Sequence, residues 1–119
     1  MNYVKHLNEF LERVKEDSRL NPTHISLYLS LFRMWNIGRF PESFFINREE
    51  VMSVSKIGSK VTYHRCISNL TAWGYIEYFP SRNPYKGSRI KILNLHPILE
   101  DIQKTIDPAV DLSNSSLRR

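Results

Sequence analysis

The residues of this chain that are best suited to chemistry are basic ones, and they are concentrated in one segment. Residues 56–95 contain a single acid, Glu77, whereas the rest of the 119-residue chain carries eleven of its 12 acids. The same segment has seven bases, which are Lys56, Lys60, Arg65, Arg82, Lys86, Arg89 and Lys91. It therefore supplies the whole formal net charge of +5. Such a segment is typical of a protein that binds a polyanion, and the alternative is a solvated basic face that only keeps the protein soluble.

Other kinds of site find little support in the sequence. The four histidines, His6, His24, His64 and His96, are scattered, and no second ligand stands at a metal-binding spacing from any of them. With four glycines in all, the chain has no glycine-rich loop to hold a phosphate, and it has no nucleophile motif and no paired carboxylates. We therefore expect no catalytic activity, no bound metal and no cofactor.

The cysteine count and the hydropathy pattern indicate the compartment. Cys66 is the single cysteine, so the chain closes no internal disulfide, and we expect a small buried side chain in a reducing cytoplasm. No apolar run approaches the roughly 18 residues that span a bilayer. Residues 1–6 run directly into an amphipathic pattern rather than a signal peptide. These features predict a cytoplasmic protein that contacts no membrane.

Hydrophobic periodicity and capping residues predict the elements that would position the basic side chains. We expect helices over residues 2–18, from Pro22 to Gly38, and over 48–55, 59–73 and 96–107, and strands over 44–46, 75–79 and 88–93. The second helix is apolar on more than one side, which places it at the centre of the core. The third begins with a variant of the capping box, at Asn47 and Glu50.

The same pattern divides the chain into four parts. An amphipathic helix within residues 1–20 precedes one domain, residues 21–95. A C-terminal helix (96–107) and a flexible tail (108–119) follow. The composition, 41% hydrophobic and 24% charged, is that of one globular domain.

The fourth predicted helix begins at a tight turn, and the spacing of its apolar residues predicts which of its residues face outward. We expect Gly58 to permit a tight turn and Ser59 to cap the helix that follows. The core-facing positions, at spacings of four, three and three residues, are Tyr63, Ile67, Leu70 and Trp73. The outward face is then formed by Lys60, Val61, His64, Arg65 and Ser68.

A basic hairpin is predicted to follow this helix. Gly74 ends the helix, and two runs of β-branched and aromatic residues follow, separated by a turn-rich basic segment at residues 80–87. Basic and apolar residues alternate in the early part of the second run, as expected for a strand with one wet face. Arg82 and Lys86 then lie at the tip of the hairpin and Arg89 on its wet face.

The order helix, strand, helix, tight turn, helix and hairpin resembles that of a winged helix-turn-helix. The stretch IGSKVTYHRCISNLTAWGYI, from Ile57 to Ile76, is similar to the recognition-helix segment of winged-helix proteins. A small capping residue, a threonine, a helical arginine, two spaced aliphatics and a Gly-aromatic-Ile ending occur in that order. The segment resembles the modules of MarR-type transcription regulators and of the N-terminal part of DnaD-type replication proteins. The resemblance, which covers roughly residues 22–95, implies an α+β, mostly helical fold with a β-hairpin wing, to which the periodicity adds an extra helix at each end.

The resemblance and the shape of DNA agree on where a duplex would bind. A helix fits the major groove, and its N-terminal residues reach the base edges. We expect Arg65 to bind a guanine edge, Val61 to contact a thymine methyl, and the wing, residues 80–88, to contact the minor groove or phosphates. The predicted DNA-binding residues are Lys56, Ser59, Lys60, Val61, His64, Arg65, Ser68, Arg82, Lys86 and Arg89. The alternatives are an ion pair of Arg65 with Glu49 or Glu50, and a wing tip that only solubilises the protein.

The expected function is sequence-specific binding of double-stranded DNA by a small bacterial transcription regulator. One alternative is an accessory DNA-binding protein of replication or of a mobile element. Another is a winged-helix module that binds only protein. The concentration of positive charge on the expected recognition helix and wing favours the two DNA-binding interpretations.

The two terminal helices predict how the protein assembles. The first carries Val4, Leu7, Phe10 or Leu11, and Val14 on one face, and the second carries Ile98, Leu99, Ile102 and Ile106. We expect these stripes to form a homodimer, because a two-fold axis places two recognition helices about 34 Å apart on a palindromic site. The alternative is that the stripes pack on their own core or on each other.

Overall fold

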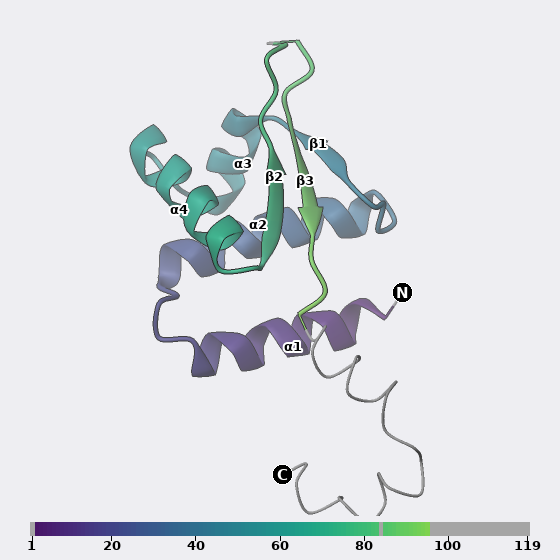
Figure 1. The fold of residues 1–119 in the computed structure, drawn as a ribbon, viewed down its shortest axis with the longest axis vertical. Coiled ribbons are helices and arrows are strands. Elements are labelled where there is room, and N and C mark those ends of the chain that lie inside the picture. The colour runs from purple at the N-terminus through teal and green to yellow at the C-terminus, as the bar shows by residue number, and fades with distance from the viewer. Residues whose placement is uncertain (1, 84, 96–119) are drawn as a thin grey trace, which may run out of the picture.

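A computed structural model describes residues 2–83 and 85–95, which form four helices and a small antiparallel sheet (Figure 1). The elements in chain order are α1 (Tyr3–Glu16), α2 (Pro22–Ile37), β1 (Phe44–Ile46), α3 (Arg48–Ser55), α4 (Lys60–Ala72), β2 (Ile76–Phe79) and β3 (Ser88–Ile92). This arrangement confirms the predicted α+β, mostly helical class. The C-terminal helix and tail that the sequence predicts lie outside the described residues. None of the described helices is long and apolar enough to span a membrane.

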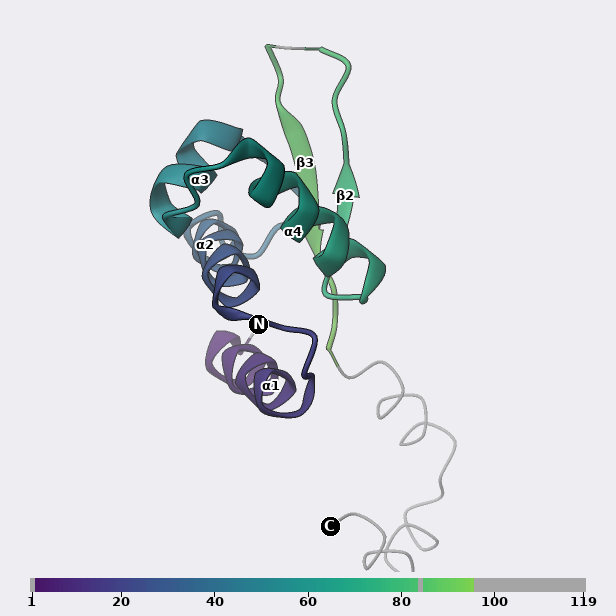
Figure 2. The same ribbon diagram turned by 90° about the vertical axis from the view of Figure 1, so that its left-hand side faces the viewer.

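The core is built around α2, as its all-round apolar pattern predicts. Leu27, Tyr28 and Leu31 of this helix are fully buried. Figure 2 shows α1 on one side of α2, and α3 and α4 on the other. The ring of Phe10 on α1 stacks on that of Tyr28 with 3.8 Å between centroids, and the edge of Tyr75 packs against both. These aromatic contacts make α1 part of the same core.

Polar side chains fix the starts of α3 and α4. The Asn47 side chain accepts a hydrogen bond from the Glu50 backbone N–H (3.1 Å), and Ser59 Oγ accepts one from the Thr62 backbone N–H (3.3 Å). Both caps satisfy amides that the first turn of a helix leaves without a partner. The predicted cap at Ser59 is therefore confirmed, and so is the Asn47 half of the predicted capping box.

The turn between α3 and α4 is built differently from the prediction. Lys56, rather than Gly58, adopts the left-handed conformation, with φ 64° and ψ 26°, and ends α3. Gly58 does not have a left-handed φ, and a Cβ added there would meet open space. The prediction that Gly58 permits the turn is therefore wrong, because the reversal occurs two residues earlier.

The sheet has the strand order β1–β3–β2, and both pairings are antiparallel. Ile90 of β3 is fully buried and stands opposite Phe44 of β1 and Tyr78 of β2. The hairpin formed by β2, β3 and the residues between them projects past the helices, at the end of the molecule away from α1 (Figures 1 and 2). The predicted hairpin is thereby confirmed as a part of the fold.

Gly87 holds the hairpin close to β1. Its φ is +72°, and a Cβ at this position would lie 2.5 Å from the carbonyl oxygen of Ile46. Both the left-handed backbone and the lack of space restrict this position to glycine. Gly87 therefore fixes where the tip of the hairpin begins.

The face that α1 turns to the core matches the predicted stripe at Leu7, Phe10 and Val14, which pack in or against the core, and differs from it at Val4. Phe10 is buried, and so is His6, whose Nε2 lies 2.7 Å from Tyr28 Oη. Val4 and Leu11, in contrast, are 52% and 46% exposed. The difference arises because His6 occupies a core position and finds a hydrogen-bond partner there. Of the two residues that the sequence left open, Phe10 is the one that packs in the core.

Candidate nucleic-acid interface

All residues predicted to contact DNA are exposed, and they stand on two neighbouring parts of the molecule. The first part, named here the α4 face, comprises Lys56, Ser59, Lys60, Val61, His64, Arg65 and Ser68. The second part, the hairpin bases, comprises Arg82, Lys86 and Arg89. Val61 is 76% exposed, although an aliphatic side chain gains free energy from burial. The structure therefore brings the predicted residues to the surface without contradicting any of them.

Core contacts on the other side of α4 fix the direction of the α4 face. Tyr63, Cys66, Ile67 and Leu70 are buried, so the residues between them point outward. Burial raises the pKa of the Cys66 thiol, and the nearby charge of Arg65 only partly opposes this. A buried thiol with a raised pKa is a poor nucleophile. The prediction that Cys66 is a small buried side chain is confirmed.

One histidine joins the start of α2 to α4. The Asn21 side chain accepts a hydrogen bond from the His24 backbone N–H (3.1 Å), and His24 Nδ1 accepts one from the Asn21 backbone N–H (3.1 Å), which completes a capping box. His24 Nε2 lies 2.9 Å from Asn69 Nδ2 on α4. Burial lowers the pKa of His24, and the charge of Arg65 lowers it further. The neutral ring thus helps to set the orientation of α4 relative to α2.

The bases of the α4 face have no acidic partner among the described residues. The ion pairs of the described chain are Lys5 with Glu9, Arg19 with Asp17, and Lys91 with Glu42. Lys60 and Arg65 take part in none of them. The alternative in which Arg65 pairs with Glu49 or Glu50 is therefore not what the structure shows. An exposed basic side chain without a carboxylate partner keeps its hydrogen-bond donors available for phosphates or for the edges of nucleotide bases.

The three hairpin bases differ in how they are held. The guanidinium of Arg89 lies 4.5 Å from the centre of the Phe79 ring and donates a hydrogen bond to Ser43 Oγ (3.2 Å). Arg82 and Lys86 lie nearer the tip of the hairpin and form no ion pair within the described chain. The side chains of Arg82 and Lys86, near the tip, therefore keep their hydrogen-bond donors free. The guanidinium of Arg89 is instead held by Phe79 and Ser43.

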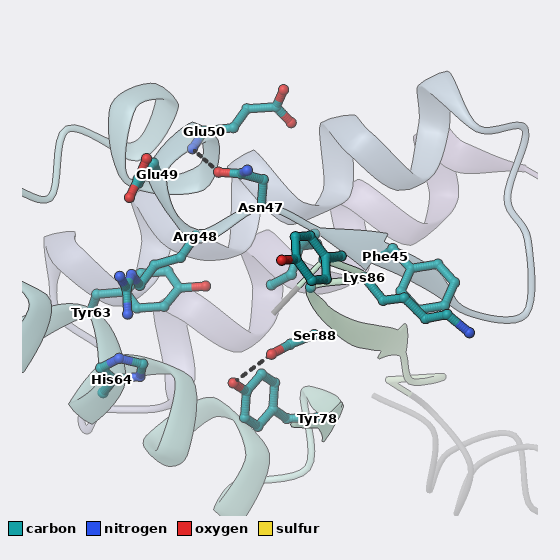
Figure 3. A pocket seen from close by; sticks show the side chains of 13 residues that line it. Phe45, Asn47, Arg48, Glu49, Glu50, Tyr63, His64, Tyr78, Lys86 and Ser88 are labelled. Carbon is teal, nitrogen blue, oxygen red and sulfur yellow. Dashed lines mark hydrogen bonds between the residues drawn. The ribbon is translucent and has the colours of Figure 1, made fainter. Parts of the chain in front are cut away.

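A groove of about 650 Å³ lies between α4, the hairpin and the segment where β1 leads into α3 (Figure 3). We call it the α4–hairpin groove. Tyr63 and His64 line it on the α4 side, and Tyr78, Tyr85 and Lys86 line it on the hairpin side. Tyr85 is 95% exposed, whereas Tyr78 is held by a hydrogen bond between its hydroxyl and Ser88 Oγ (3.0 Å). The groove thus combines aromatic side chains with two basic residues, Arg48 and Lys86, and two acidic ones, Glu49 and Glu50.

Arg48 is a residue of this groove that the sequence analysis missed. It is the first residue of α3, and its side chain reaches toward Tyr63 and His64 (Figure 3). Along the chain it belongs to the neutral stretch 21–55, so the division of charge gave no signal. One sequence signal could have found it. Arg48 directly follows the helix cap Asn47, so it stands at the start of α3.

Residues 2–83 and 85–95 contain no group of three or more His, Cys, Asp or Glu that could hold a metal ion. Comparisons of the chain with protein-family models, with curated proteins and with solved structures found no match. The function therefore has to be argued from the site itself.

Proposed function

We propose that residues 22–95 form a winged helix-turn-helix domain that binds double-stranded DNA. The order α2, β1, α3, tight turn, α4 and hairpin supports this proposal. The observation that carries it is the α4 face, because bases without acidic partners line one side of a helix whose other side is anchored in the core. A module that binds only protein has no reason to hold such a face beside a basic hairpin.

In the proposed complex, α4 is the recognition helix. Its first turns enter the major groove, where Lys60, His64 and Arg65 meet base edges. Arg65 has the donors for two parallel hydrogen bonds to guanine, and the exposed Val61 supplies an apolar contact for a thymine methyl. The remaining residues of the α4 face, Lys56, Ser59 and Ser68, meet phosphates and set the position of the helix.

The hairpin is the wing in this proposal. It stands beside α4 and projects beyond it, so a duplex that contacts α4 also meets the tip (Figures 1 and 2). Arg82 and Lys86 then contact the minor groove or the phosphates that border it. Arg89 packs against the Phe79 ring and stabilises the part of the wing next to the helices.

The salt dependence of binding tests the proposal most directly. If about five of the basic residues meet phosphates, the slope of log affinity against log salt concentration is about −4 to −5. Fluorescence anisotropy with a labelled duplex at several salt concentrations measures this slope. Absence of binding at low salt, or a flat dependence, would overturn the proposal and leave a protein-binding module as the remaining interpretation.

Within DNA-binding proteins, we propose a small transcription regulator of the bacterial cytoplasm. The runner-up is an accessory DNA-binding protein of replication or of a mobile element. Selection of bound sites from random duplexes separates the two, because a regulator has to prefer one sequence strongly over the bulk of the genome. Enrichment of a single palindromic site supports the regulator, and an absence of sequence preference supports the accessory protein.

We also propose that the protein forms a homodimer through the exposed face of α1. Val4 and Leu11 are exposed there, whereas Leu7, Phe10 and Val14 of the predicted stripe pack in or against the core of the same chain. A second copy is the expected occupant, because two recognition helices on a two-fold axis match a palindromic site. Light scattering after size exclusion is expected to give about twice the chain mass of 14.1 kDa.

Paired substitutions are the better test of this contact than removal of the helix. Deleting residues 1–18 would take Phe10 out of the core, so a change of mass would not separate lost stability from a lost contact. The double variant Val4→Glu, Leu11→Glu changes only exposed positions and is expected to be a folded monomer. If it stays dimeric, the contact is carried by the chain beyond Leu95 or by another face.

A further inference from the structure

One side chain of the α4–hairpin groove has a buried polar atom without a hydrogen-bond partner. Nε of Arg48 is buried and has no hydrogen-bond partner within the described structure. Buried polar groups nearly always have a partner, because leaving one unpaired costs free energy. Arg48 as a whole is only partly buried and lines the groove, although its Nε is enclosed.

The groups that face Arg48 do not neutralise it. Tyr63 and His64 approach from α4, Lys86 lines the opposite wall, and Glu49 and Glu50 follow Arg48 on α3. No ion pair joins Arg48 to either glutamate, and Figure 3 shows Glu50 directed away from the guanidinium. The guanidinium lies close enough to Tyr63 to act on its phenol, whose pKa burial raises to about 12 against the opposing effect of Arg48. The groove thus holds an arginine charge that neither of its two lining carboxylates, Glu49 and Glu50, pairs with.

We propose that Arg48 binds a backbone phosphate of a DNA strand that runs through the α4–hairpin groove. This inference rests on the proposed function and deepens it by assigning a phosphodiester site outside α4 and the wing tip. A guanidinium that packing holds in one orientation donates parallel hydrogen bonds to phosphate oxygens at little loss of side-chain entropy. Lys86 on the facing wall supplies a second cation along the path of the same strand.

The position of Arg48 determines what it contributes to recognition. Its side chain rises from the start of α3 and reaches the groove beside the first two turns of α4, rather than the outer surface of that helix. A contact there meets the sugar-phosphate backbone and not the base edges. Arg48 is therefore a positioning contact that sets how deeply α4 enters the major groove, and its effect on affinity is the same for every sequence.

Charge-matched variants test the proposal. Arg48→Gln is expected to make the slope of log affinity against log salt shallower by about 0.9, which is about a fivefold loss of affinity at about 0.15 M salt. Arg33→Gln removes the same charge from an exposed site on α2 outside the groove and is the control. Arg48→Lys keeps the charge and is expected to retain most of the slope. If Arg48→Gln and Arg33→Gln behave alike while the wild type binds DNA, the inference is overturned and the proposed function stands.

Duplexes with one neutral methylphosphonate at a time identify the phosphate. At one position the wild type is expected to lose about fivefold in affinity, and Arg48→Gln is expected to lose nothing further. Equal losses for both proteins at every position would show that Arg48 contacts no phosphate. A wild type that binds no duplex at all would overturn the proposed function and this inference together.

A measurement on the wild type covers the case in which Arg48→Gln fails to fold. Because Nε of Arg48 is buried, we expect its N–H to exchange slowly with water and to give an NMR signal, which is assigned by its absence from Arg48→Lys. Addition of a duplex is expected to shift this signal, and a duplex with a methylphosphonate at the contacted position is not. An unchanged signal at saturating DNA contradicts the proposal.

Discussion

Arg19 and Arg65 are both exposed arginines, yet their surroundings are opposite. Arg19 follows α1 and donates two hydrogen bonds of 2.8 Å to the Asp17 carboxylate, and its guanidinium lies 4.7 Å from the centre of the Trp73 ring. Arg65, on α4, has no acidic partner in the described chain. The same side chain thus serves as a structural contact in one region and stays available in the other.

The region around Arg19, named here the Asp17 cluster, consists of Asp17, Arg19, Trp73 and Tyr75. Tyr75 Oη donates a hydrogen bond to the same carboxylate (2.9 Å). The bond from Arg19 is the main reason why the pKa of Asp17 lies far below its usual value, and the bond from Tyr75 adds to it. The cluster joins the end of α1 to the end of α4. Substitutions there should change the stability of the fold, whereas substitution of Arg65 on the α4 face should change binding alone.

The largest effect is expected at the aromatic stack that anchors α1. Phe10→Ala removes a fully buried ring that stacks on Tyr28 and should lower the free energy of unfolding by about 3–5 kcal/mol. Leu11→Ala, at the exposed neighbouring position, should cost less than about 1 kcal/mol. Urea unfolding followed by circular dichroism compares the two. A larger loss for Leu11→Ala would mean that α1 turns its other face to the core.

The next effect is expected at the hairpin anchor. Gly87→Ala places a Cβ 2.5 Å from the Ile46 carbonyl oxygen at a left-handed φ and should destabilise the protein by about 2–3 kcal/mol. Gly58→Ala is the matched control, because its Cβ meets open space. It should change stability by no more than about 0.5 kcal/mol. Thermal unfolding measures both, and equal melting temperatures would contradict the close approach of Gly87 to β1.

Arg65 on the α4 face should show the reverse behaviour, with an effect on binding and none on stability. Arg65→Ala is expected to cost about 1–3 kcal/mol of binding free energy on a preferred duplex and to relax discrimination at that position. Its free energy of unfolding should stay within about 0.5 kcal/mol of the wild type, since no partner is lost. Unchanged affinity for both preferred and random duplexes would show that the reading face is wrongly assigned.

The tip of the hairpin can be compared with the α4 face, because its basic residues are expected to contact phosphates and not nucleotide bases. Arg82→Ala and Lys86→Ala are expected to weaken binding to all duplexes by similar factors and to make the salt slope shallower by about 1 each. Anisotropy titrations with one preferred and one random duplex measure both quantities. A loss confined to the preferred duplex would make the tip a reader of sequence rather than a phosphate contact.

The smallest effect is expected at the Asp17 cluster and depends on pH. The pKa of Asp17 is lowered in the folded protein, so the stabilisation is complete above the unfolded value of about 4 and is lost as the pH falls toward the folded value. Asp17→Asn should therefore cost about 1 kcal/mol at pH 7 and progressively less below pH 4 or so. Urea unfolding at neutral and acid pH measures the difference. A constant difference at all pH values would contradict the role of the carboxylate charge.

Local signals allowed most element boundaries to be predicted. Ser59 and Asn47 cap the helices that follow them, Pro22 stands in the first turn of α2, and Gly74 has the positive φ that ends the segment of α4. These features act within three or four residues of the chain, so the sequence alone contains them. The three strands were predicted for the same reason, since their β-branched and aromatic runs are contiguous.

Features that depend on distant residues could not be predicted. The choice between Phe10 and Leu11 follows from the burial of His6, which requires the hydroxyl of Tyr28 22 residues further on. Arg48 joins the interface only because α4 and the hairpin fold against the start of α3. Periodicity reports the width of an apolar stripe but not its phase, and the charge of a segment does not report which charges meet in space.

Lys56 shows where the chain departs from what stability alone would select. A residue with a Cβ at a left-handed φ costs about 1 kcal/mol relative to glycine, and helices commonly place glycine at this point. The neighbouring glycine, Gly58, stands where any residue would fit. Lys56→Gly should therefore give a more stable protein that has lost one cation next to α4. Position 56 is a point at which an engineer can exchange the proposed affinity for DNA against thermal stability with a single substitution.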